Sequence, residues 1–69
     1  MQLSTRNQIS GTVAEVTRGD VVASIKVTLT GGETITSVVT SEAVDELDLA
    51  AGAPVKVLVK ATEVMLATD

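Results

Sequence analysis

The clearest pattern in the chain is a strict alternation of apolar and polar residues from position 21 to position 30. One side carries Val21, Ala23, Ile25, Val27 and Leu29, and the other carries Ser24, Lys26, Thr28 and Thr30. A period of two predicts a β-strand with one buried face. The pair Gly31-Gly32 follows directly and predicts a tight hairpin turn, because adjacent glycines accept the positive φ angles of such turns. A further strand is therefore expected from about Glu33 to Val39.

Weaker patterns predict the elements on either side of this hairpin. A run rich in β-branched residues from Ile9 to Thr17 predicts a first strand, which ends at the turn residues 18–20. After the hairpin, the hydroxyls of Thr40 and Ser41 are candidate N-caps of a short helix of about two turns. The apolar face of this helix is expected to carry three residues, namely Ala43, Val44 and Leu47.

The last third of the chain returns to the strand pattern. Gly52 is expected to end the connector and Pro54 to start a strand, in which Val55, Val57 and Val59 alternate with residues 56, 58 and 60. A fifth strand is expected to carry Val64, Met65 and Leu66. The order β-β-β-α-β-β predicts an all-β fold with one short helix. It is the element order of an OB-fold-like five-stranded Greek-key barrel, formed by residues 1–69 as a single domain.

The composition limits the interactions that can stabilise this domain. A core of 69 residues supplies only roughly 3–5 kcal/mol of net stability, and small chains usually add disulfides, a metal or a partner subunit. The chain has no Cys and no His, and its apolar residues include twelve valines but no aromatic residue. We therefore expect a homo-oligomer, with apolar surface buried between subunits.

Charge and composition also exclude several functions. A net charge of −4 with no aromatic side chain argues against a nucleic-acid partner, which requires basic patches or stacking platforms. No signal pattern and no membrane-spanning run of ~18 apolar residues is present, so a cytoplasmic location without membrane contact is expected. The lack of His, Cys and Tyr removes the usual general bases and thiol nucleophiles, so we do not expect an enzyme.

Two of the five basic residues have polar neighbours suited to an oxyanion. Arg6 follows Ser4 and precedes the amides of Asn7 and Gln8, and Lys60 is followed by Ala61 and the hydroxyl of Thr62. A guanidinium holds two oxygens of a tetrahedral anion, and an ammonium adds a point charge. The alternative is that both residues are ordinary surface charges, as expected for Arg18, Lys26 and Lys56.

Four segments resemble one known family. They are Ser4-Thr5-Arg6-Asn7-Gln8, followed by Gly-Thr-Val from Gly11; the segment 35–40 that ends in Thr40; the helix-like segment 42–47; and Lys60-Ala61-Thr62-Glu63-Val64. In this order they are similar to the molbindins, the small molybdate-binding domains of the Mop or TOBE type. The family usually has Ala where this chain has Thr5, and often Ser where it has Thr62.

The resemblance implies a function and a site. It implies cytoplasmic binding of molybdate or tungstate as a store or buffer, with no organic cofactor and no free metal cation, in a hexamer built as a trimer of dimers. It places the anion between subunits, with the opening segment from one chain and the Lys60 segment and Thr40 from a neighbour. The implied ligands are Ser4, Arg6, Asn7, Gln8, Thr40, Lys60, Ala61 and Thr62, with a second class of site at the backbone near Val22 and Ala23.

Three alternatives remain at this stage. The chain could be an accessory ligand-sensing module, which its start at its own Met1 with no second domain argues against. It could also be a structural oligomerisation module without a storage role, or an OB-type nucleic-acid binder, which its acidity argues against. The preference between molybdate and tungstate, the number of anions per oligomer, the release mechanism and any downstream partner are not encoded in recognisable patterns.

Overall fold

A long, curved strand organises the molecule. The computed structural model describes residues 4–69, in which β1 (Asn7–Arg18) pairs with two other strands. Its second half pairs with β2 (Val22–Leu29), and its first half, from Asn7 to Thr12, pairs with β4 (Pro54–Val59). With β3 (Thr34–Thr40) beside β2, the sheet has the order β3-β2-β1-β4, and every neighbouring pair is antiparallel.

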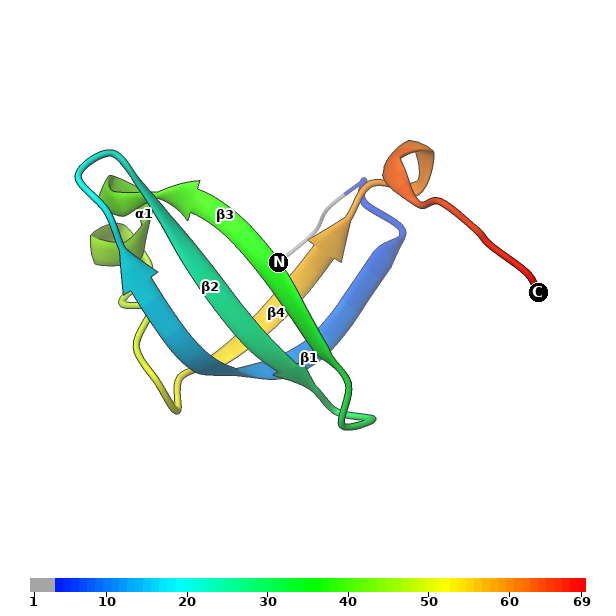
Figure 1. The fold of residues 1–69 in the computed structure, drawn as a ribbon, viewed down its shortest axis with the longest axis horizontal. Coiled ribbons are helices and arrows are strands. Elements are labelled where there is room, and N and C mark those ends of the chain that lie inside the picture. Colours follow the sequence, from blue (N-terminus) through cyan, green and yellow to red (C-terminus); the bar gives the residue numbers. More distant parts are fainter. Residues whose placement is uncertain (1–3) are drawn as a thin grey trace.

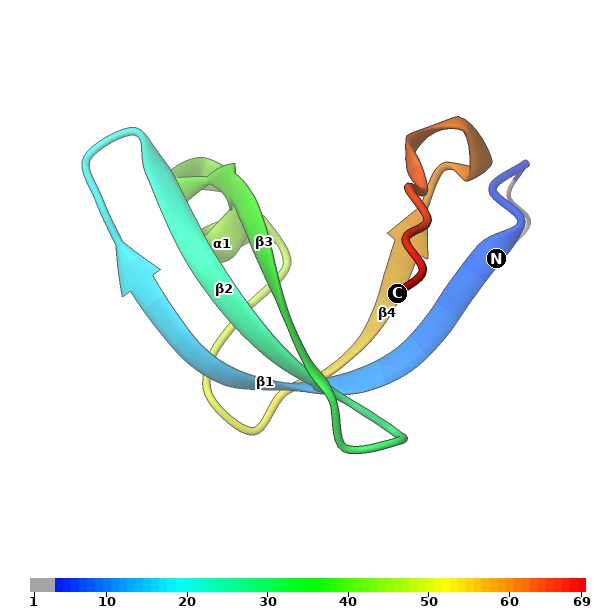
Figure 2. The same ribbon diagram turned by 45° about the vertical axis from the view of Figure 1, so that its right-hand side comes forward.

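The sheet curls into a half-barrel with β3 and β4 at its two edges (Figures 1 and 2). The register of β1 and β2 shifts between Val13 and Glu15, so Ala14 is an extra residue in β1. Such an extra residue increases the local twist and bend of a strand. This curl, together with the single short helix, confirms the predicted OB-type all-β class.

Gly11 lies where β1 carries both partners, since it is opposite Leu29 in β2 and Val55 in β4. A Cβ atom at this position would lie 2.7 Å from Cγ1 of Val27 and 2.9 Å from the carbonyl oxygen of Thr28. No real side chain packs that closely. The absence of a side chain therefore allows β2 to cross close to β1 at the point where the sheet bends.

The core is small and entirely aliphatic. Five hydrophobic residues are buried among those described: Val13, Ala23, Ile25, Val27 and Val44. The first four come from β1 and β2, and Val44 comes from the helix α1 (Ser41–Glu46), which covers one end of the sheet. The alternation predicted for β2 is confirmed from Ala23 to Leu29. Val21 is an exception, since it lies before the strand and is 73% exposed.

Turn and cap residues behave largely as the sequence predicted. The hairpin between β2 and β3 contains Gly32 at φ 96°, and Gly52 adopts φ 93° before Pro54 begins β4. Thr40 is the N-cap of α1, and its hydroxyl oxygen accepts a hydrogen bond of 3.0 Å from the N–H of Ala43. Leu47 is the C-cap and is mostly exposed, so the apolar face expected for the helix is reduced to Ala43 and Val44.

The expected fifth strand is the main correction. Within residues 4–69 the sheet has four strands, and β4 is followed by a short 3₁₀ turn, η1 (Ala61–Glu63). Beyond this turn the chain extends away from the half-barrel (Figure 1), where Met65 is 93% and Leu66 92% exposed. The apolar run 64–66 was expected to form a strand, but within residues 4–69 this segment has no neighbouring strand to pair with.

The close packing at Gly11 generates a prediction about stability. Gly11→Ala should lower the free energy of unfolding by roughly 1–3 kcal/mol, because the new methyl group displaces Val27 or the backbone of β2. The measurement is urea denaturation followed by circular dichroism. Thr12→Ala, at the next and exposed position, is the control and should change stability by less than about 0.5 kcal/mol. Equal stability of Gly11→Ala and the parent would contradict the packing described here.

Candidate functional site

The segments that flank β1 and β4 meet at one end of the half-barrel. Asn7 begins β1 and is paired with Val59, which ends β4. Because the pairing is antiparallel, the residues before Asn7 and after Val59 emerge side by side. They enclose a surface depression of about 310 Å³, lined by Ser4, Thr5, Arg6, Lys60, Ala61 and Thr62. Both cationic residues singled out from the sequence therefore line the same depression.

Two amide side chains of the opening segment fix the position of this loop. Nδ2 of Asn7 donates to the carbonyl oxygen of Val59 at 3.1 Å, which ties the start of β1 to the end of β4. Nε2 of Gln8 donates to the carbonyl oxygen of Thr5 at 3.0 Å, which closes the turn before the strand. Neither residue is among those that line the depression. In this chain their side chains position the loop, and their role as ligands, which the resemblance implies, stays a prediction.

Neither Arg6 nor Lys60 has a carboxylate within 4.0 Å. The one ion pair within residues 4–69 joins Arg18 to Asp45, so the charges of Arg6 and Lys60 are not neutralised by a neighbour. Lys60 is also the N-cap of η1 and caps it with no side-chain hydrogen bond. The first N–H groups of a helical turn have no hydrogen-bond partner inside the turn. The backbone N–H groups at the start of η1 are therefore further hydrogen-bond donors beside Lys60.

Thr40, Val22 and Ala23 lie at the opposite end of the sheet. Ala23 is opposite Arg18 at the far end of β1, and Val22 is paired with Thr40. The length of β1, roughly 35 Å at ~3.3 Å per residue before curvature, separates them from Arg6. Ala23 is buried, so only its backbone could meet a ligand, whereas Thr40 and Val22 are exposed.

This placement differs from the implied arrangement in one respect. The resemblance divides the opening and closing segments between two chains, but here one chain brings both segments to the same depression. Thr40 is the implied ligand that a single chain leaves apart. An anion can contact Thr40 and Arg6 together only where two chains meet.

Arg18 has a role that the sequence did not reveal. It was expected to be a solvated turn residue, but Nη1 and Nη2 donate to the two carboxylate oxygens of Asp45 at 2.8 and 2.7 Å. This double contact lowers the pKa of Asp45 through the hydrogen bond and the charge of Arg18, and raises the pKa of Arg18. The pair links the end of β1 to α1, and no local pattern indicates it because 27 residues separate the partners.

The remaining lysines fit the simpler interpretation. Nζ of Lys26 lies 3.4 Å from Oγ1 of Thr36, and Nζ of Lys56 donates to Oγ of Ser10 at 3.1 Å. Both residues are exposed. Across residues 4–69, no three acidic side chains come together in a way that could hold a metal ion. The same residues include no helix long and apolar enough to cross a bilayer.

The curled antiparallel sheet and the cationic depression at its end define a small β-domain of the OB type. The chain belongs to the TOBE domain family, whose model matches residues 3–66. It is 38% identical to molybdenum-pterin-binding protein 2 of Clostridium pasteurianum over 66 residues, which cover 96% of this chain and 97% of that protein. The predicted membership of the Mop and TOBE group is thereby confirmed.

Solved structures support the same family. A molybdate-binding protein from Sporomusa ovata superposes with a TM-score of 0.93 at 37% identity, covering 99% of this chain and 100% of that one. The cytoplasmic molybdate-binding protein ModG, with molybdate bound, has a TM-score of 0.85 at 43% identity and covers 88% of this chain but 43% of its own. The fold therefore occurs both as a whole chain and as part of a longer one.

The Arg18–Asp45 pair generates a prediction with a defined pH dependence. Because the folded state lowers the pKa of Asp45, the pair stabilises the fold above the ordinary aspartate pKa and loses its effect as pH falls through the lowered value. Asp45→Asn should therefore reduce Tm slightly at about pH 7 and have no effect at about pH 2. Thermal melts at both pH values test this. A difference in Tm that persists undiminished at the acidic pH would contradict it.

Proposed function

We propose that residues 1–69 form a single domain that binds molybdate, or tungstate, reversibly and without chemical change, and so serves as a store or buffer of the anion. The observation that carries this proposal is the pairing of two unneutralised cations, Arg6 and Lys60, in one depression. The similarity to the molybdate-binding protein from Sporomusa ovata and to ModG with molybdate bound supports the choice of anion. A cytoplasmic location is part of the proposal, as described for ModG.

The chemistry of the depression suits a tetrahedral dianion. The planar fork of Arg6 can hold two oxygens and stays charged at any physiological pH, while Lys60 supplies a compact positive charge. The hydroxyls of Ser4 and Thr62 and the backbone N–H groups of the turn are available for the remaining oxygens. Exposed carboxylates elsewhere weaken binding little, because a Debye length of ~8 Å at physiological salt screens them.

A homo-oligomer, with a hexamer built as a trimer of dimers as the expected form, is the second part of the proposal. Only five hydrophobic side chains are buried in the described chain, whereas Val21, Val22 and Val38 stay exposed near Thr40. Burial of these residues against another subunit would add the stability that the small core lacks. The family resemblance implies that Thr40 of one chain then lies near the depression of another.

A second candidate is an accessory ligand-sensing or structural module without a storage role. The observation that favours it is the match to ModG, which extends over only 43% of that chain. The two functions differ in what bound anion does. A store holds many anions and changes little, whereas a sensing module changes its contacts with another domain or protein when it is loaded.

Native mass spectrometry tests the assembly and the ligand together. At micromolar concentration the protein should appear as a species several times the 7.1 kDa chain mass, expected to be six chains, and molybdate should add whole numbers of anions per oligomer. A folded monomer that binds no molybdate would refute both parts of the proposal. A stable oligomer that takes up no molybdate would favour the structural module.

Substitution of the two cations tests the site. Arg6→Ala and Lys60→Ala should each reduce molybdate binding by roughly 2–5 kcal/mol, because the dianion loses one of its charge partners. The matched control is Lys56→Ala, four positions before Lys60, where an exposed lysine contacts Ser10 and should leave affinity unchanged. Isothermal titration calorimetry measures the affinities, after each variant is shown to keep its oligomeric state. Parent-like affinity in assembled Arg6→Ala and Lys60→Ala would show that the site lies elsewhere.

Competition between anions tests selectivity. Sulfate is also a tetrahedral dianion but is smaller than molybdate, so donors fixed at molybdate distances would be stretched away from sulfate. Tungstate, which is nearly the size of molybdate, should compete on equal terms, and sulfate or phosphate should compete poorly. Calorimetric displacement measures this order. Equal competition by sulfate would indicate a general anion site.

A further inference from the structure

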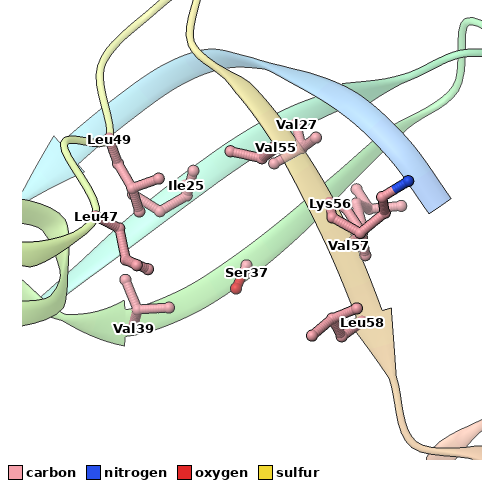
Figure 3. Close-up of a pocket in the computed structure, with 11 residues that line it drawn as sticks. Ile25, Val27, Ser37, Val39, Leu47, Leu49, Val55, Lys56, Val57 and Leu58 are labelled. Atoms are coloured by element: carbon pink, nitrogen blue, oxygen red, sulfur yellow. The ribbon is translucent and has the colours of Figure 1, made fainter. Parts of the chain in front are cut away.

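The concave side of the half-barrel contains an apolar hollow that does not suit a dianion. It has a volume of about 180 Å³ and lies between β2 and β3 on one side and β4 on the other (Figure 3). Its walls are mostly aliphatic, with Ser37 as the only hydroxyl, so few donors would replace the hydration of an anion there. The depression beside β1 and β4 is lined instead by two cations and three hydroxyl residues, and the selectivity of the proposed site must arise from them.

Thr5 is the third hydroxyl residue of the depression, beside Ser4 and Thr62. It is half-buried, whereas Ser4 and Thr62 are exposed. Among the hydrogen bonds between residues 4–69, none involves the hydroxyl of Thr5, and no fully buried polar side-chain atom of these residues lacks a partner. The hydroxyl of Thr5 is therefore open to solvent and free to donate to a ligand.

The turn before β1 fixes the position of Thr5. Nε2 of Gln8 donates to the carbonyl oxygen of Thr5 at 3.0 Å, which holds the backbone of Thr5 against the start of the strand. The side chain of Thr5 is also restricted, because a residue branched at Cβ has little freedom at χ1. The hydroxyl therefore has a nearly fixed place and cannot move far to meet an anion of a different size.

The two cations of the depression are adaptable by comparison. Arg6 and Lys60 are exposed, and each carries its charge at the end of a long side chain with several rotatable bonds. Such side chains can follow the oxygens of a small or a large dianion, so they supply attraction with little discrimination. A fixed donor does discriminate, because a hydrogen bond of good length to one anion is stretched to a smaller one.

The facing wall of the depression leaves space in front of Thr5. The residues before Asn7 and those after Val59 form the two walls, and counting outward from this pair places Thr5 at the level of Ala61. The side chain of Ala61 is a single methyl group, so it neither fills the space nor offers a hydrogen bond. Thr5 thus supplies the polar side chain at this level of the depression.

We propose that Thr5 is a further ligand of the anion and the residue that determines its size preference. The hydroxyl of Thr5 donates to one oxygen of molybdate and, because its place is fixed, makes a poorer hydrogen bond to the smaller sulfate. This inference rests on the proposed function, since it concerns the same depression. It assigns different effects to two residues. Loss of the Arg6 charge should weaken both dianions alike, whereas loss of the Thr5 hydroxyl should weaken molybdate more than sulfate.

Calorimetric titration of the full chain with molybdate, alone and in competition with sulfate, tests the assignment. Thr5→Val keeps the size and branching of the side chain but removes the donor. It should lower molybdate affinity roughly tenfold to a hundredfold, as for a lost hydrogen bond to a charged group, and the ratio of molybdate to sulfate affinity should fall. Thr5→Ser keeps the hydroxyl on a less restricted side chain and should lose roughly threefold in molybdate affinity. Thr28→Val, at an exposed threonine of β2 outside the depression, is the matched control and should bind like the parent.

The outcomes separate this inference from the proposed function. Parent-like affinity in Thr5→Val would overturn the inference, and so would an equal loss in Thr5→Ser, because the effect would then belong to the shape of the side chain. A loss shared equally by molybdate and sulfate would also overturn it. In each case the parent still binds molybdate, so the proposed function stands. A parent that binds no molybdate would refute both. Thr5→Ala, which also removes the donor, gives the same comparison if Thr5→Val alters the assembly.

Discussion

The antiparallel pairing of β1 with β4 is the constraint on which the rest of the structure depends. Because Asn7 is opposite Val59, the loop that carries Arg6 and the turn that carries Lys60 emerge together. The same pairing forces β1 to serve two partners along its length, which in turn requires Gly11 at the crossing and the extra residue Ala14 at the bend. The cationic depression thus results from the register of β1 and β4, and the hydrogen bond from Asn7 to Val59 stabilises this register.

An all-aliphatic core sets the limits of what one chain can do. Without aromatic side chains, each buried residue removes little apolar surface from water, and five such residues cannot offset the entropy of ordering 69 residues by a wide margin. The described residues are too few to close the barrel. They leave the edges of β3 and β4 unpaired and an apolar hollow between these two strands.

Much of the fold could be predicted because local patterns specify it. The alternation in β2 reflects a half-buried strand, and Thr40 has the hydroxyl and the following acidic turn that define an N-cap. The failures concern partners that local patterns do not identify. Residues 64–66 are an apolar run that suits a strand, but whether a strand forms depends on an edge to pair with. Arg18 looked like a turn residue because its partner Asp45 is distant in sequence.

The candidate site shows the same division. Residue types and the family resemblance predict Arg6 and Lys60 as ligands, and the register of β1 and β4 brings both residues to one depression. The chemistry of Asn7 and Gln8 as donors was recognised, but the acceptors they meet in this chain, the carbonyl oxygens of Val59 and Thr5, could be identified only from the folded chain. A hydrogen-bond donor in a sequence motif does not reveal which acceptor it meets.

The cap of α1 would link ligand occupancy to local order if Thr40 contacts the proposed anion. The hydroxyl oxygen of Thr40 accepts the N–H of Ala43, so its own proton is free to be donated outward. An acceptor that takes this proton polarises the hydroxyl and makes its oxygen a stronger partner for Ala43, since hydrogen bonds in a chain reinforce one another. With an anion bound at Thr40, the first turn of the helix would exchange its amide protons more slowly. The order of this helical turn would then depend on whether an anion is bound at Thr40.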